Sequence, residues 1–150
     1  MTLLFVYGSL KEGFPNYPHN RGTRLPGAFR TVQPHPFYLA DGSLPCLLDE
    51  PGSGLPVIGQ LFEVGDAELQ ALDRLERVGE PGGYRRVELA VQAAAQAAVQ
   101  SDAQTATQPA EAPVVLAQAY VQDRARLTQG GPHVGPIAEY TPEHARRLSW

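Results

Sequence analysis

The chain has 150 residues, of which 43% are hydrophobic, and this size and composition predict one compact domain with a hydrophobic core. The net charge of -4 is spread along the chain without a basic run, which argues against nucleic-acid binding. The single cysteine cannot form an internal disulfide, and no paired cysteine or histidine spacing is typical of zinc, so we expect no disulfide framework and no metal site.

The chain begins with a short apolar run, LLFVY, at residues 3–7. We expect a buried strand here, which ends at Gly8. The run is far too short to cross a membrane and lacks the basic leader of a signal peptide, so we expect a cytoplasmic protein that does not associate with membranes. Residues 8–20, GSLKEGFPNYPHN, are rich in glycine, proline and asparagine, and this composition predicts a loop.

The middle of the chain predicts several short strands followed by one helix. Residues 28–48 contain short aromatic and aliphatic runs broken by turn sequences, which indicate two or three strands. Residues 57–64 alternate as a strand with one apolar face. Asp66 is then the predicted N-cap of an amphipathic helix that runs to about Val78, where the sequence GEPGG ends it.

The rest of the chain predicts two more strands, at residues 84–91 and 114–121, and a short terminal helix at residues 141–148. Residues from about 92 to 112 consist mainly of alanine, glutamine, threonine and serine, and cannot bury enough surface to offset the entropy of ordering. We therefore expect a mobile insertion at a hairpin tip. The order of the elements predicts an α+β fold for a single domain over residues 1–150, not a repeating βαβ pattern.

One acidic residue lies on the apolar face of the predicted central helix. At roughly 100° per residue, Glu76 falls between two leucines on the helical wheel. In one interpretation its carboxylate is partly exposed and pairs with Arg77, Arg85 or Arg86. In the other it faces an enclosed apolar site, where its pKa is raised and it can act as a general base and acid near neutral pH.

A second candidate lies where the first strand ends, in VYGSLKEG at residues 6–13. A glycine at this point lets successive backbone N–H groups point the same way and bind an anion such as a carboxylate. The alternative is an ordinary turn without a ligand. The glycine and lysine spacing of a phosphate-binding loop is missing.

The remaining reactive side chains do not form a recognisable site. Ser9 and Ser43 lack the sequence of a nucleophile elbow, and Cys46, within LPCLL, is typical of a small core residue. We therefore expect no covalent intermediate. The histidines are scattered without metal-ligand spacing at His19, His35, His133 and His144.

Two segments together resemble the gamma-glutamylcyclotransferase-like family, and most closely its gamma-glutamylamine cyclotransferase branch. FVYGSLKEGFPN, at residues 5–16, is similar to the branch's Tyr-Gly-Thr-Leu-Lys loop with its following Pro-Asn. LDRLERVGEPGGYRR, at residues 72–86, is similar to the family's Leu-Asp-x-x-Glu stretch, which ends in the catalytic glutamate, and to the Tyr-x-Arg segment after it. The resemblance spans residues 3 to about 123.

The resemblance implies a small mixed β-barrel with flanking α-helices. It also implies release of 5-oxoproline and a free amine from gamma-glutamylamines, by attack of the substrate's α-amine on its γ-carbonyl, with Glu76 as the proton shuttle. No cofactor, metal or macromolecular partner is implied. Tyr84 would line the site, and the backbone of the first loop would bind the substrate at Tyr7, Gly8, Ser9 and Leu10.

Two other functions stay open on the sequence. The same cavity could serve a non-catalytic small-molecule sensor, although a glutamate at position 76 favours catalysis over binding alone. An interaction domain that recruits a partner through its insertion is a third hypothesis, which deletion of residues 93–112 would test.

Overall fold

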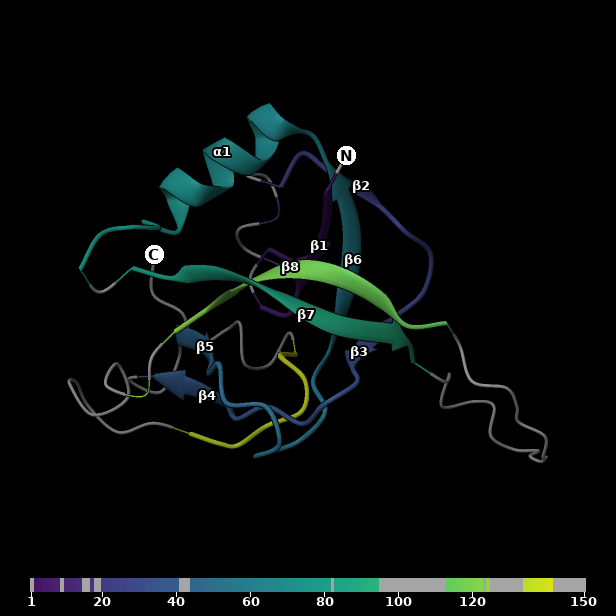
Figure 1. The fold of residues 1–150 in the computed structure, drawn as a ribbon, viewed down its shortest axis with the longest axis vertical. Coiled ribbons are helices and arrows are strands. Elements are labelled where there is room, and N and C mark those ends of the chain that lie inside the picture. The colour runs from purple at the N-terminus through teal and green to yellow at the C-terminus, as the bar shows by residue number, and fades with distance from the viewer. Residues whose placement is uncertain are drawn as a thin grey trace.

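The computed structural model describes residues 2–8, 10–14, 17, 20–40, 44–81, 83–94, 113–122, 124 and 134–141. These residues form eight strands and one helix, shown in Figure 1. The elements are β1 (Thr2–Val6), β2 (Thr23–Arg24), β3 (Phe29–Thr31), β4 (Phe37–Ala40), β5 (Leu44–Leu47), β6 (Ile58–Val64), α1 (Asp66–Leu75), β7 (Arg85–Ala93) and β8 (Val115–Val121).

Five strands close into a mixed barrel in the order β1-β8-β7-β3-β6, because β6 also pairs with β1. The β1–β8 pair is parallel, and the other pairs of the barrel are antiparallel. The short strand β2 pairs with β6 beside β3, and β4 and β5 form a separate hairpin. This arrangement confirms the predicted α+β fold with a small mixed barrel.

β1 is buried on both faces, which explains its continuous apolar sequence. Phe5 points into the barrel, whereas Leu4 and Val6 pack outward against α1. The inner core comprises Phe5, Tyr7, Phe37, Leu39, Leu47, Val57, Leu61, Leu89, Val91, Ala117, Ala119, Val121 and Tyr140. The helix cluster comprises Leu4, Val6, Leu10, Phe62, Val64, Leu69, Leu72 and Tyr120.

The helix differs from its prediction at both ends. Gly65, in an extended conformation, is the N-cap and provides no side-chain hydrogen bond, so the prediction of Asp66 as the cap is wrong. Asp66 is the first helical residue, where its charge still favours the positive end of the helix dipole. The helix ends at Leu75, earlier than predicted, and Glu76 is its C-cap.

The other predicted elements agree with the structure where it describes them. The strands predicted at residues 3–7, 57–64, 84–91 and 114–121 correspond to β1, β6, β7 and β8, and residues 28–48 contain the three strands β3, β4 and β5. Most of the predicted insertion, residues 95–112, and nearly all of the predicted terminal helix lie outside the described residues. Over the part of the chain that is described, no helix has the length and apolar composition needed to cross a membrane.

Candidate active site

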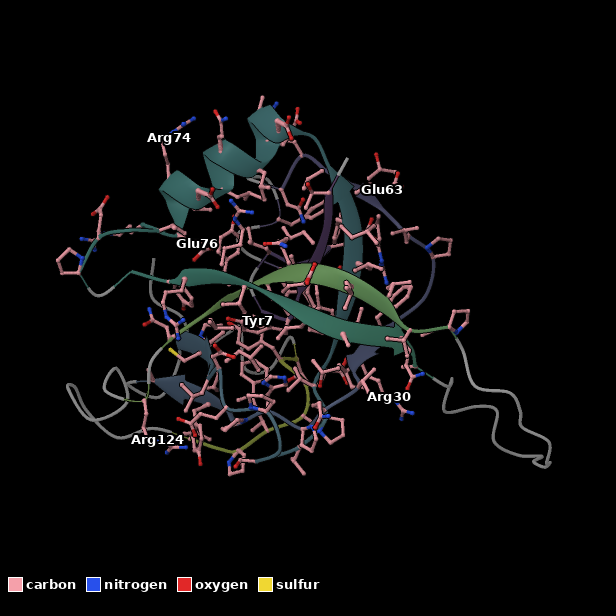
Figure 2. The ribbon with its side chains drawn as sticks, viewed as in Figure 1. Tyr7, Arg30, Glu63, Arg74, Glu76 and Arg124 are labelled. Atoms are coloured by element: carbon pink, nitrogen blue, oxygen red, sulfur yellow. The ribbon has the colours of Figure 1, made fainter. Side chains whose placement is uncertain are left out.

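Glu76 lies at the C-terminal end of α1, on the side of the barrel where β7 begins (Figure 2). Its side chain is partly buried, and burial raises the pKa of its carboxyl group to about 7. A carboxyl group with a pKa near 7 can both accept and release a proton at neutral pH, because both protonation states are well populated there.

The turn after the helix fixes the position of Glu76. The Val78 N–H donates to the Asp73 carbonyl (2.9 Å) and the Arg77 N–H donates to the Arg74 carbonyl (3.1 Å), which is the Schellman pattern of helix termination. This pattern requires a left-handed residue, which is Arg77 with φ of 60°. Val78 then packs against the helix cluster and anchors the turn.

The same turn returns the chain to Glu76. The Tyr84 N–H donates to the Glu76 carbonyl (2.9 Å), so the two residues are neighbours in space. A side chain at position 83 would be blocked, because a Cβ there would lie 1.9 Å from the Arg77 carbonyl oxygen. Gly83 is therefore needed for the close approach that places Tyr84 beside Glu76.

Two tyrosines, one buried (Tyr7) and one partly buried (Tyr84), accompany Glu76, and both donate their hydroxyl protons to backbone carbonyls. The Tyr84 hydroxyl donates to Pro45 (2.6 Å) and the Tyr7 hydroxyl donates to Tyr120 (2.5 Å). Burial, and after it the neighbouring Cys46 and Glu76, raise the pKa of both phenols. Both phenols therefore stay neutral. Each oxygen takes part in a second hydrogen bond, with the Leu47 backbone for Tyr7 and with Cys46 for Tyr84, and keeps one further lone pair as an acceptor.

The first loop reaches the same region through Gly8. A Cβ on Gly8 would lie 2.9 Å from the Pro45 Cβ, so a glycine is required for this contact. Pro45 is the residue whose carbonyl accepts the Tyr84 hydrogen bond. Leu10 is buried in the helix cluster, and Ser9 lies outside the described residues.

Lys11 anchors the other end of this loop. Its buried ammonium group donates to the Tyr140 carbonyl (2.5 Å) and lies 4.4 Å from the centre of the Phe14 ring. Burial lowers the pKa of Lys11 to about 8. The sequence showed this residue only as part of a motif and gave no sign of its burial.

Each of the three arginines considered as partners of Glu76 has another carboxylate nearby. Arg77 pairs with Glu80 (3.2 Å), and the nearest Arg85 nitrogen lies 3.8 Å from an Asp49 oxygen. The third, Arg86, pairs with Asp73 (2.9 Å). Burial alone shifts the pKa of Glu76, which favours the interpretation of this residue as an acid in an apolar environment.

The described residues contain no group of three or more histidine, cysteine, aspartate or glutamate side chains that could hold a metal ion. Cys46 is fully buried, as predicted for a core residue, and it also hydrogen-bonds Tyr84.

Comparison with known proteins gives consistent matches. Residues 4–135 match the family described as "Gamma-glutamyl cyclotransferase, AIG2-like". A gamma-glutamylaminecyclotransferase of Homo sapiens is 41% identical over 98 residues, which cover 61% of this chain and 63% of that protein. The protein of the same name from Mus musculus is 39% identical over 101 residues, which cover 61% of this chain and 64% of that protein. The aligned part thus spans less than two thirds of either relative.

Two solved structures share the fold over the whole chain. The crystal structure of an AIG2-like protein from Mus musculus has a TM-score of 0.61 and 29% identity, and the match covers 100% of this chain and 85% of that one. The solution structure of A2LD1 has a TM-score of 0.69 and 27% identity, and covers 100% and 96% of the two chains.

Proposed function

Because this chain belongs to the gamma-glutamyl cyclotransferase, AIG2-like family, we propose that it is a cyclotransferase that converts gamma-glutamylamines to 5-oxoproline and a free amine. The observation that carries the proposal is Glu76, a partly buried carboxylate with a pKa of about 7, which the resemblance of the Leu-Asp-x-x-Glu stretch matches to the family's glutamate. The names of the relatives, gamma-glutamylaminecyclotransferase, support this substrate class.

In the proposed reaction, Glu76 moves protons from the attacking nitrogen to the departing nitrogen. The ionised carboxylate takes a proton from the substrate's α-ammonium group, and the free amine attacks the γ-carbonyl carbon. Glu76 gives this proton to the side-chain nitrogen and takes the second proton from the ring nitrogen, and the bond between the γ-carbonyl carbon and the side-chain nitrogen breaks. The released amine then takes up the second proton, which leaves 5-oxoproline as a neutral lactam. The attack is intramolecular, so holding the substrate folded supplies much of the rate enhancement.

The phenol oxygens suit the recognition of the α-ammonium group. The hydroxyl protons of Tyr7 and Tyr84 are donated to backbone carbonyls, and each oxygen keeps one lone pair beyond its hydrogen bond with the Leu47 backbone or with Cys46, so each can accept one hydrogen bond from a cationic substrate nitrogen. The donors for the negative charge that develops on the γ-carbonyl oxygen must then come from elsewhere. We assign this role to backbone N–H groups of the first loop, around Gly8, Ser9 and Leu10.

The test is detection of 5-oxoproline by mass spectrometry after incubation with a panel of gamma-glutamylamines and gamma-glutamyl amino acids. We expect product from the wild type and none from Glu76→Gln, whose amide keeps the shape of the side chain but cannot carry the proton. Glu80→Gln is the matched control, since Glu80 lies in the next turn and pairs with Arg77 at the surface. Absence of product from the wild type, or near-normal turnover by Glu76→Gln, would contradict the proposal.

A further inference from the structure

Asp73, one helical turn before Glu76, joins α1 to two strands of the barrel. Its carboxylate accepts two hydrogen bonds from Arg86 of β7, at 2.9 and 3.1 Å, and one from the Tyr120 hydroxyl of β8, at 2.8 Å. The Arg86 contact is bidentate, a geometry that fixes orientation as well as distance. Arg86 also donates to the side chain of Gln118 (3.3 Å).

This network continues into the candidate active site in two directions. Through the backbone, the Asp73 carbonyl accepts the Val78 N–H, the bond that closes the turn around Glu76. Through Tyr120, whose backbone carbonyl accepts a hydrogen bond from the Tyr7 hydroxyl, the network reaches one of the tyrosines beside Glu76. One aspartate is thus connected by hydrogen bonds to the turn that presents the carboxylate and to one of its tyrosine neighbours.

A partly buried acid at the end of a helix needs such support to stay in its apolar surroundings. Glu76 is the C-cap residue, directly beyond the last helical residue, and its ionised form is better solvated by water than by its apolar surroundings. A small rotation of the helix end would expose it. The bidentate pair between Asp73 and Arg86 opposes this rotation, because both of its hydrogen bonds would have to break.

We propose that Asp73, Arg86 and Tyr120 are positioning residues that hold Glu76 inside the site and prevent it from turning out to solvent. The proposal rests on the proposed function for its effect on turnover, but its effect on the environment of Glu76 can be measured without substrate.

The test uses two variants that remove opposite charges, Asp73→Asn and Arg86→Gln, and follows the Glu76 carboxyl group by carbon NMR during a pH titration. The titratable groups that face Glu76 are Tyr7, Tyr84 and Tyr120. The pKa of each phenol is raised above its ordinary value of 10.0, so all three remain neutral while Glu76 titrates and do not complicate its titration.

If the network positions Glu76, both variants move its titration to lower pH, by about one unit or more, because the carboxylate gains access to water. If the pair acts only through its charges, loss of Asp73 lowers the pKa and loss of Arg86 raises it. Shifts in opposite directions, or titrations that match the wild type in both variants, would overturn the proposal.

Two further variants separate positioning from a change of charge and from the loss of any surface ion pair. Tyr120→Phe removes one hydrogen bond without changing any charge and keeps the carbonyl that binds Tyr7, so we expect a smaller shift in the same direction. Glu50→Gln breaks a bidentate pair of the same kind with Arg124 on a different part of the surface (Figure 2), and we expect no shift. A shift in Glu50→Gln equal to that in Asp73→Asn would contradict a local positioning effect.

Turnover provides the second readout. We expect Asp73→Asn and Arg86→Gln to lower kcat about 100-fold while KM changes little, because a displaced base impairs the chemical step more than binding. A wild type that makes no 5-oxoproline, together with shifted titrations in both variants, would refute the proposed function and leave the positioning role standing. An active wild type, together with Glu76 titrations that match the wild type in both variants, would refute the positioning role and leave the proposed function standing.

Discussion

Replacing Glu76 with glutamine should stabilise the folded protein above neutral pH and have no effect in acid. Burial raises the pKa of Glu76 from its ordinary value of 4.5 to about 7 in the folded state. Between these two values the folded protein binds more protons than the unfolded chain, so the free energy of unfolding decreases as the pH rises. The decrease is complete above about pH 7, where the carboxyl group is ionised in both states.

The size of this effect follows from the shift. The rise in pKa from 4.5 to about 7 corresponds to about 3–4 kcal/mol, at about 1.4 kcal/mol for each tenfold change in the equilibrium. The side chain is only partly buried and water screens its charge, so we expect Glu76→Gln to be more stable by about 1–2 kcal/mol at pH 8.

Urea unfolding of both proteins at about pH 4, 6 and 8 measures this difference directly. We expect a stability difference near zero at about pH 4 that grows through about pH 6 and then levels off. In Glu80→Gln, which removes a surface carboxylate, the difference from wild type should not follow this course. A stability difference for Glu76→Gln that is independent of pH, or a loss of stability at pH 8, would refute a buried and ionised Glu76.

Three further predictions concern activity and the two turns beside the site. The value of kcat/KM should fall as the pH drops below about 7, because the base must be ionised; an acid limb near pH 4 would instead indicate an ordinary exposed carboxylate. Gly8→Ala should cost about 1–3 kcal/mol in urea unfolding and reduce turnover, since its Cβ would lie 2.9 Å from that of Pro45, and unchanged stability would disprove the tight contact. Arg77→Gly should stabilise the protein by up to about 1 kcal/mol, because φ of 60° suits glycine and the exposed pair that it loses contributes little; thermal unfolding at a lower temperature than wild type would count against this.

Much of the barrel could be predicted because its strands carry local patterns. The strands β1, β6, β7 and β8 show apolar runs or alternation that depend only on which faces are buried. The two ends of the helix were harder to predict. Asp66 has the chemistry of an N-cap and of a first-turn residue alike, and the structure uses it as the second. At the other end an arginine occupies the left-handed position where glycine is typical, so the sequence indicated a later stop.

The residues of the candidate site likewise fall into one that the sequence pattern indicated and others that it did not. Glu76 was detectable because an acid between leucines violates the helical pattern, and its unusual environment produced that signal. Tyr7, Gly8 and Tyr84 came from family resemblance, since nothing in their spacing indicates a shared site. The partners of Asp73 lie 13 and 47 residues further along the chain, and only the register of β7 with β8 brings them together.

The parallel pairing of β1 with β8 has a consequence for how the protein folds. β1 can be paired on both sides only after β8, the last strand that the structure describes, has joined the barrel, because β8 is its partner on that side. Contacts between such distant segments form slowly, since a long loop must close before they gain any stability. The acceptor for the Tyr7 hydroxyl and the Tyr120 contact with Asp73 both belong to β8, so the site is assembled only when the barrel closes. During refolding, recovery of turnover should therefore follow barrel closure and lag behind formation of the helix.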